Sequence, residues 1–312
     1  MALITVIGSL NKDLVTRTSR VPGAGETLTA NSFSTGSGGK GANQAVACAR
    51  LSKHDARSKG DVEVRMIGCV GMDSFGQELI EGLNKDGINT TGVLLLEGKT
   101  TGVSVIIVEE DTGENRIMFS PGANYSLNPE QFIGLPSPVP DLIVLQMEIS
   151  LATILQVLEI SRKNAVDVLL NPAPAVELPD AAYQAITHLL LNETEAALLS
   201  QRSDSDYVKI VKRFHDLGVK NVVITLGSEG AFLSTSDEHQ RVLAEKVQVV
   251  DTTAAGDTFV GAYAVSVARA TRTGQRPNIT EAVRRATKAA ALTVQKPGAQ
   301  SAIPFMGEIP DS

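Results

Sequence analysis

Residues 250–259 read Val-Asp-Thr-Thr-Ala-Ala-Gly-Asp-Thr-Phe and place a carboxylate after a turn of small residues. The hydrophobic pattern predicts a strand at 246–250 before this turn and a helix at 258–270 after it. At such a junction, free backbone N–H groups and the positive end of the helix dipole can bind a phosphate. The amides concerned belong to Ala254, Ala255, Gly256 and Asp257.

The Asp257 carboxylate needs a reason to lie beside a phosphate, because the two negative charges repel each other. A base that accepts the proton of an attacking hydroxyl must be acidic, which would make Asp257 catalytic. The alternative is that Asp257 only caps the helix, a common use of aspartate. Taken alone, the motif leaves both interpretations open.

A second glycine-rich run, Gly-Ser-Gly-Gly-Lys-Gly-Ala-Asn-Gln-Ala-Val-Ala at 36–47, also leads into a helix. It matches the dinucleotide-binding fingerprint, but Asp61 and Glu63 open the next strand instead of closing it, and the run lies well beyond the first strand. A Walker A loop would need glycine at Ser34 and serine or threonine at Gly41. We therefore expect helix-terminus amides, not a P-loop, to bind phosphate.

Three further motifs lie between these two runs. They are Asn-Pro-Ala-Pro-Ala at 171–175, Asn-Glu-Thr-Glu at 192–195 and Thr-Leu-Gly-Ser-Glu-Gly at 225–230. In order and approximate spacing, the motifs resemble the ribokinase-like family of carbohydrate kinases, over essentially the whole chain. The resemblance implies transfer of a phosphoryl group from MgATP to a sugar hydroxyl, with Asp257 as the base.

The resemblance also implies a set of sugar-binding residues at the tips of separate elements. They are Asn11, Asp13, Gly39, Lys40, Asn43, Glu148 and Asp257. Each has a simpler alternative. Asn11 and Asp13 are typical of a turn, Lys40 of a solvated charge, and Glu148 of an acid in the first turn of a helix.

For the nucleotide, the resemblance implies contacts from the later motifs and the anion-binding turn. The positions are Asn192, Glu195, Thr225, Gly227, Ser228, Gly230, Ala255, Gly256 and, near the adenine, Thr287. Glu195 would act on Mg²⁺ through water, since magnesium keeps several waters and takes few protein oxygens. The alternatives are a capping box between Asn192 and Glu195 and an ordinary hairpin turn at 225–230.

The resemblance also implies activation by K⁺, held beside the anion-binding turn. The matching positions are Asp251, Thr253, Thr293, Lys296 and Gly298. Ala302 stands where the family often has serine, which removes one hydroxyl unless Ser301 or water replaces it.

The whole-chain composition limits the partners of this 312-residue protein. A net charge of −7 disfavours nucleic acids and anionic membranes. The apolar stretch at the start of the sequence is too short, and is followed too soon by charged residues, to be a signal sequence. No apolar run approaches the length of a membrane span. Cys48 and Cys69 lack metal-type spacing and are expected to be reduced core residues. We expect a cytoplasmic protein, with the nucleus as a further location in a eukaryote.

The elements that position these motifs alternate between strands and helices. Strands are predicted at 3–8, 62–70, 142–147, 166–170, 188–191 and 221–226, and helices at 42–51, 75–86, 151–163, 205–217, 258–270 and 280–294. This order predicts a single α/β domain over 1–312 with a doubly wound, mainly parallel sheet in three Rossmann-like layers. In such sheets ligands bind beyond the carboxyl ends of the strands, where the motifs fall.

Two stretches interrupt the alternation. Residues 14–35 show no helical period, and 101–120 predict a hairpin around a turn at 111–114. We expect about 11–36 and 98–121 to form a small sheet. The resemblance makes it a lid over the sugar and a homodimer contact, whereas the alternative is a pair of ordinary edge strands.

The glycine run and the 171–175 motif are typical of family members that phosphorylate ribose, and the scarcity of aromatic residues disfavours a nucleoside substrate. Kinases acting on 2-deoxyribose, fructose or adenosine remain alternatives, because they share the catalytic motifs. A catalytically silent sugar or nucleotide sensor is the different-class alternative. A sensor has no use for the base at Asp257.

Overall fold

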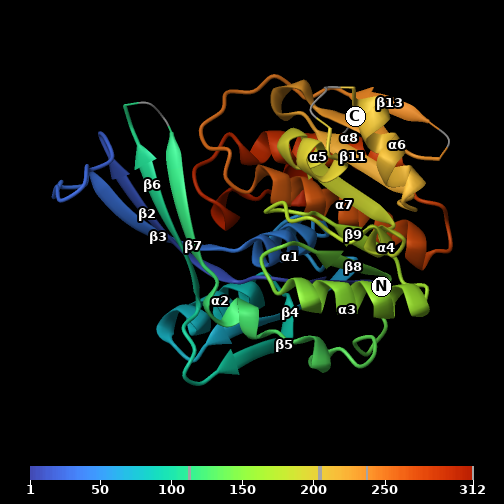
Figure 1. The fold of residues 1–312 in the computed structure, drawn as a ribbon, viewed down its shortest axis with the longest axis horizontal. Coiled ribbons are helices and arrows are strands. Elements are labelled where there is room, and N and C mark those ends of the chain that lie inside the picture. The colour runs from blue at the N-terminus through green and yellow to red at the C-terminus, as the bar shows by residue number, and fades with distance from the viewer. Residues whose placement is uncertain (112–113, 203–205, 237, 311–312) are drawn as a thin grey trace.

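The computed structural model describes residues 1–111, 114–202, 206–236 and 238–310. A large sheet of nine strands has the order β13-β12-β11-β10-β9-β8-β1-β4-β5. Neighbours from β5 to β11 pair in parallel, and β12 and β13 add an antiparallel edge (Figure 1). The strands are β1 (Ala2–Ile7), β4 (Val62–Gly71), β5 (Asn89–Leu96), β8 (Leu142–Leu145), β9 (Val168–Leu170), β10 (His188–Asn192), β11 (Asn221–Thr225), β12 (Ala231–Ser234) and β13 (His239–Val242).

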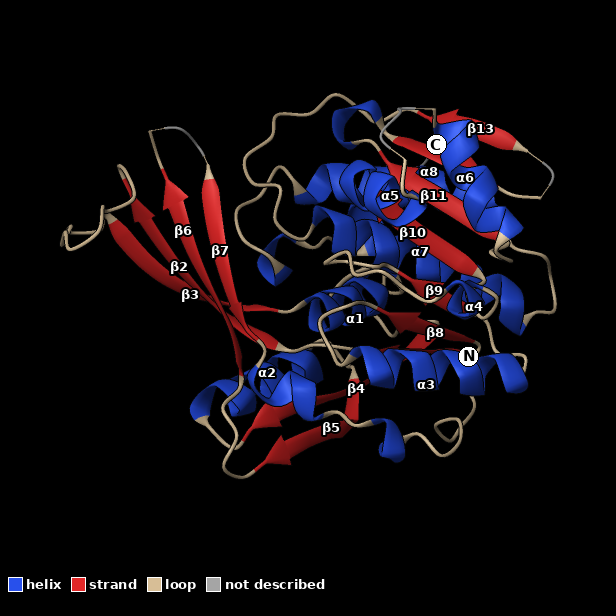
Figure 2. Cartoon of the chain, in the orientation of Figure 1, coloured by secondary structure: helices blue, strands red, loops and turns tan. Residues whose placement is uncertain are grey.

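Helices cover both faces of this sheet, which confirms the predicted three-layer fold (Figure 2). Alternate residues of β8 show the division, because Leu142 and Val144 pack on one side while Ile143 and Leu145 pack on the other. One side holds α1 (Lys40–Leu51), α2 (Ser74–Lys85), α7 (Ala255–Arg272) and α8 (Ile279–Thr293). The other holds α3 (Leu151–Lys163), α4 (Asp180–Tyr183), α5 (Glu193–Ser200) and α6 (Tyr207–Asp216).

A second sheet of four strands, in the order β3-β2-β6-β7, stands off from the main body (Figure 1). Its strands are β2 (Asn11–Thr18), β3 (Ser32–Gly38), β6 (Gly102–Glu109) and β7 (Asn115–Ser120). The predicted hairpin is therefore present as β6 and β7, although residues 112–113 of its turn lie outside the described part of the chain. Residue 205, the predicted start of the helix at 205–217, also lies outside the described part of the chain.

The strand predicted at 246–250 is wrong. This segment is an irregular connection whose Val249 and Val250 are more than half exposed. Its alternating apolar residues imitate a strand, but the Val250 amide bonds instead to the carbonyl of Val294 at the end of α8. The helix of the anion-binding motif thus follows a loop.

Cys48 and Cys69 are free and buried, and burial raises the pKa of the Cys48 thiol to about 12. Among the described residues, no helix combines the length and the apolar character needed to cross a bilayer.

Candidate active site

The small-residue turn forms the start of α7. Ala254 precedes the helix in the left-handed conformation, with φ 59° and ψ 8°, which costs about 1–2 kcal/mol for a residue with a side chain. The amides of Gly256 and Asp257 lie in the first turn, where no intrahelical acceptor is within reach. The Ala255 amide donates a long bond, 3.3 Å, to the carbonyl of Thr252. The turn therefore presents amides at the positive end of a long helix.

Asp257 does not cap α7. It is 6% exposed, and its carboxylate accepts two hydrogen bonds of 2.9 Å from α1, one from Asn43 Nδ2 to Oδ2 and one from Gln44 Nε2 to Oδ1. The two amides bring the glycine-rich run of α1 against the anion-binding turn of α7, although the two segments lie more than 200 residues apart. The structure thus joins both motifs around one carboxylate.

A cleft of about 240 Å³ opens at this carboxylate, beyond the carboxyl ends of β9, β10 and β11. Its polar lining comes from Lys40, Asn171, Asn192, Glu195, Thr225, Thr252 and Asp257. Burial is the largest influence on the Lys40 ammonium and lowers its pKa, but the charges of Asp257, Glu148 and Glu195 together raise the pKa above its usual value. We call this space the phosphate cleft, because a cation, a helix N-terminus and small residues meet there.

Asn192 and Glu195 form the capping box that the sequence allowed. The Asn192 side chain accepts from the Glu195 amide at 2.8 Å, and Glu195 Oε2 accepts from the Asn192 amide at 2.9 Å. Burial raises the pKa of the Glu195 carboxyl. Because both residues also line the phosphate cleft, the cap and a role beside phosphate are compatible.

The predicted sugar residues converge around Glu148. Its Oε2 accepts from Ser9 Oγ at 2.6 Å, from the Lys40 amide at 3.0 Å and from Asn11 Nδ2 at 3.3 Å. The glycine-rich run approaches the chain after β1 so closely that a Cβ at Gly41 would lie 2.5 Å from the Ser9 amide nitrogen. Gly39 precedes α1 with φ 87°, a conformation that favours glycine.

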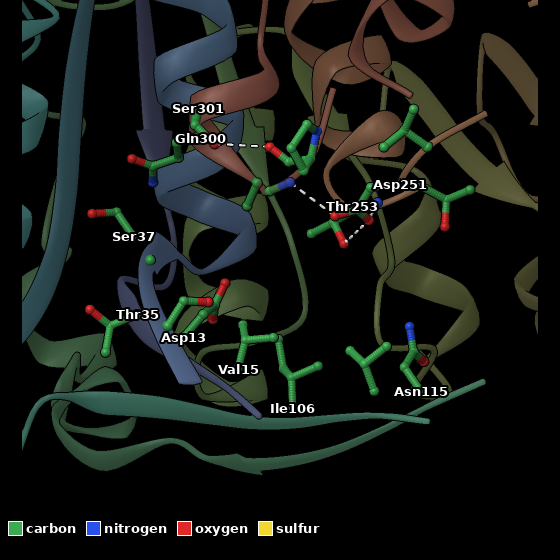
Figure 3. A pocket seen from close by; sticks show the side chains of 18 of the residues that line it. Asp13, Val15, Thr35, Ser37, Ile106, Asn115, Asp251, Thr253, Gln300 and Ser301 are labelled. Atoms are coloured by element: carbon green, nitrogen blue, oxygen red, sulfur yellow. Dashed lines mark hydrogen bonds between the residues drawn. The ribbon is translucent and has the colours of Figure 1, made fainter. Parts of the chain in front are cut away.

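Asn11 and Asp13 do not form a turn. They open β2, and Asp13 projects into a larger cleft of about 1110 Å³ between the small sheet and the loops around Asp251 and Gly298 (Figure 3). Burial raises the pKa of the Asp13 carboxyl to about 6, and the nearby charges of Glu148 and Asp257 act in the same direction, against a hydrogen bond with Ser104. A largely buried acid, bonded to Ser104, thus lines the larger cleft.

We expect Asp13→Asn to stabilise the ligand-free protein at pH 7.5 while weakening sugar binding. The folded pKa of about 6 exceeds the pKa of about 3.8 of an aspartate in the unfolded chain, so this group favours folding below about pH 4 and loses that contribution as the pH rises through 6. The gain at pH 7.5 is up to about 3 kcal/mol, for a shift of about two units. Thermal unfolding should show that Asp13→Asn melts at a higher temperature than the wild type at pH 7.5, and that this difference is smaller at pH 5. A variant less stable than the wild type at pH 7.5 would contradict this prediction.

The two segments predicted to hold K⁺ are brought together. Asp251 Oδ1 accepts from the amide and hydroxyl of Thr253 at 2.9 and 2.6 Å, and its Oδ2 accepts from the Gly298 amide at 2.9 Å (Figure 3). Burial works to raise the pKa of the Asp251 carboxyl, but these bonds together lower it. The hydroxyl of Thr293 is buried against Thr258, and the ammonium of Lys296 pairs with Glu308. These two positions therefore have only their backbone carbonyls to offer a cation.

Ala302 is fully buried and offers no hydroxyl. Ser301 lies close to the same loop, because a Cβ at Gly298 would be 2.5 Å from Ser301 Oγ. Ser301 thus places a hydroxyl beside the loop from which the serine at 302 is missing.

Four of the residues predicted to bind the nucleotide, Gly227, Ser228, Gly230 and Thr287, do not line the phosphate cleft. Gly227 and Ser228 form a short 3₁₀ turn after β11, and Gly230 adopts φ 96° where a Cβ would lie 2.0 Å from the carbonyl of Val242. The turn therefore also joins β11 to β12, as the hairpin alternative held. Thr287 is buried in α8 and donates to the carbonyl of Val283, away from the residues lining either cleft.

Sequence reasoning gave no role to three residues that hold the site in place. Ser9 and Gln44 contact Glu148 and Asp257 directly, and buried Asn124 donates from Nδ2 to Asn11 Oδ1 at 2.7 Å. Gln44 was within the glycine-rich motif, whereas Asn124 comes from a 3₁₀ turn at Gly122–Ser126 with no local signal of its contact with β2.

A model of the pfkB family of carbohydrate kinases matches residues 1–306. The chain belongs to this family. It is 45% identical to a ribokinase of Schizosaccharomyces pombe, covering 100% of this chain and 98% of that protein. It is 37% identical to a deoxyribokinase of Salmonella typhi, covering 96% and 95% respectively.

Among solved structures, the Arabidopsis thaliana ribokinase complexed with ribose and ATP superposes with a TM-score of 0.84 at 31% identity, covering 99% of this chain and 97% of that one. The resemblance inferred from the motifs is therefore confirmed, and so is the pairing of a large parallel sheet with a smaller one. The chain is therefore a member of the carbohydrate kinases. Its two glycine-containing motifs are in contact through Asp257.

Proposed function

We propose that this protein transfers the γ-phosphoryl group of MgATP to the 5-hydroxyl of D-ribose. One observation carries the proposal: Asp257 is buried at the start of α7, where it bonds to Asn43 of the glycine-rich run and lines the phosphate cleft beside the helix amides. The pfkB family membership and the ribokinases among the relatives support the sugar and the nucleotide. A site that joins a base to an anion-binding turn serves a reaction between a hydroxyl and a phosphate.

In the proposed reaction, Asp257 accepts the proton of the 5-hydroxyl as its oxygen forms a bond to the γ-phosphorus. The bond from that phosphorus to the bridging oxygen of ADP breaks, and the electron pair leaves with ADP. The amides of Ala255, Gly256 and Asp257 would stabilise the charge on the transferred group, as preorganised donors do in a site shielded from water. Lys40, which lines the same cleft, would neutralise part of this charge.

The phosphate cleft suits a magnesium ion bound mainly by phosphate and water. Glu195 contributes a buried carboxylate, and both of its oxygens already accept from Asn192. Such a donor set fits contact through water, which is the way magnesium usually meets proteins. Bound with ATP, the ion would shield the phosphate charges, while Asn192 and Glu195 would orient its water shell.

We also propose that K⁺ activates the reaction beside Asp251, whose carboxylate joins the loop before α7 to the loop at Gly298. Replacing K⁺ with tetramethylammonium should lower kcat about tenfold, equivalent to about 1.4 kcal/mol at the transition state. Asp251→Asn should show this lower kcat in both salts. Glu110→Gln, in the same large cleft, should keep the normal K⁺ response; equal activity of the wild type in both salts would refute the cation site.

The small sheet supports two further proposals, a lid over the sugar within a single domain and a homodimer contact. Its edge strands β3 and β7 expose Phe33 at 63%, Ile117 at 59% and Met118 at 59%. Exposed apolar side chains on unpaired strand edges favour association with a second copy. Because the proposed reaction consumes MgATP, we place the protein in the cytoplasm, with the nucleus as a further location in a eukaryote.

The acceptor is tested by comparing D-ribose with 2-deoxyribose, fructose and adenosine. ADP release measured over a range of each acceptor concentration should give the highest kcat/KM with ribose. A higher value with 2-deoxyribose would move the substrate, in line with the deoxyribokinase among the relatives, and would keep the mechanism. No acceptor-dependent ADP release with any of them would favour a silent sensor.

A further inference from the structure

Two glutamines, Gln44 of α1 and Gln146 just after β8, lie behind Asp257, and both are 0% exposed. Gln44 Nε2 donates to Asp257 Oδ1 at 2.9 Å and to Asn171 Oδ1 at 3.1 Å. Gln44 Oε1 accepts from Gln146 Nε2 at 2.7 Å. The chain of contacts therefore runs from Gln146 through Gln44 to the base.

These contacts allow only one orientation of the Gln44 amide. Turning it over would aim its oxygen at the oxygens of Asp257 and Asn171, and would aim its NH₂ group at the NH₂ group of Gln146. In the observed orientation both N–H groups and the carbonyl oxygen of Gln44 have partners. Gln146 thus fixes which end of Gln44 meets the base.

Stability alone does not account for Gln146. Its Oε1 is buried without a hydrogen-bond partner among the described residues, which costs about 1–3 kcal/mol. Space for that oxygen also requires glycine at position 8, because a Cβ on Gly8 would lie 2.0 Å from Gln146 Oε1. An apolar side chain of similar size would avoid the unpaired buried oxygen, so the contact of Gln146 with Gln44 is what the glutamine contributes.

We propose that Gln44 and Gln146 are positioning residues for the base: Gln44 holds Asp257 Oδ1, Gln146 holds Gln44, and Oδ2 is left to face the acceptor hydroxyl. This inference rests on the proposed function and deepens it. Oδ2 is the oxygen bonded to Asn43, whose own Oδ1 is buried and lacks a partner among the described residues. Because Gln44 bonds to Oδ1 and Asn43 bonds to Oδ2, the carboxylate cannot rotate away from the hydroxyl, and displacements of about 1 Å can cost about 10²-fold in rate.

The test is a double-mutant cycle of Gln44→Met and Gln146→Met, which remove the hydrogen bonds and keep most of the volume. We expect Gln44→Met to lower kcat about 30-fold, within the range for a misplaced group, with the dissociation constant for ribose changed less than about threefold. Gln146→Met should lower kcat about fivefold. The double variant should be no slower than Gln44→Met, because Gln146 acts only through Gln44.

Thr153→Val is the matched control, since Thr153 is fully buried in α3 and bonds to the carbonyl of Leu127 away from the site. It should lower the melting temperature as much as the glutamine variants and leave kcat within about twofold of the wild type. The inference is overturned by additive effects in the double variant, by a Gln44→Met kcat near the wild-type value, or by an equal loss in Thr153→Val. If Asp257→Asn also keeps its activity, the proposed function fails as well.

Discussion

Asp257→Asn is expected to lower kcat by about 10³-fold, within the range for loss of a general base, while the dissociation constant for ribose changes less than about tenfold. The carboxylate does its work in the transition state, when the hydroxyl proton leaves, so its loss falls on kcat more than on binding. The amide keeps the size and part of the contacts with Asn43 and Gln44.

The measurement is steady-state ADP release with saturating MgATP and ribose, together with calorimetric titration of ribose. Asn43→Asp is an informative comparison, because it adds a negative charge beside the base and should weaken ribose binding as well as turnover. An Asp257→Asn enzyme with a kcat near the wild-type value would remove Asp257 from the mechanism. A parallel loss of kcat and of ribose binding would make the residue structural.

Lys40→Met is expected to lower kcat/KM for MgATP by about 10²–10³-fold, the range for loss of one group that stabilises developing charge. Lys40 faces the charges of Asp257, Glu148 and Glu195, which raise its pKa despite burial. Without the ammonium, the carboxylates of Asp257 and Glu195 would meet the incoming phosphates in the cleft with no compensating charge from Lys40.

Lys40→Arg tests whether charge alone suffices. It should recover part of the lost activity, because guanidinium also pairs with phosphate, but its larger planar group fits the small cleft less well. Initial rates at varied MgATP concentration give kcat/KM for each variant. A Lys40→Met value within about fivefold of the wild type would show that Lys40 is only a solvated charge.

The sequence was most informative where a motif is local. The anion-binding turn, the capping box at Asn192 and the glycine-rich run each depend on a few adjacent residues, and the structure contains the turn, the cap and the positive-φ glycine. The alternating order of strands and helices predicted the doubly wound fold for the same reason. The sequence did not predict which residues far apart along the chain would contact one another.

Three cases show this limit in physical terms. The alternation at 246–250 indicated a strand, but pairing depends on a free neighbouring strand, and the segment bonds to the end of α8 instead. The turn offered as an alternative for Asn11 and Asp13 was wrong, because both residues open β2, and their polar character gave no sign of the pairing of β2 with β3 and β6. Gln44 was passed over because a glutamine inside a helix is ordinarily solvated, and only the packing of α1 on α7 shows that it is fully buried.

The central claim is that Asp257 accepts the proton of the ribose 5-hydroxyl as the γ-phosphoryl group passes from MgATP to that oxygen. Phosphorus NMR of the wild type and of Asp257→Asn, each with MgATP, D-ribose and K⁺, tests it most directly. We predict that the wild type converts the γ-phosphate signal of ATP into that of ribose 5-phosphate, and that the variant forms no detectable product on the same time scale. Free phosphate in place of the sugar phosphate, or equal product from both proteins, would contradict the claim.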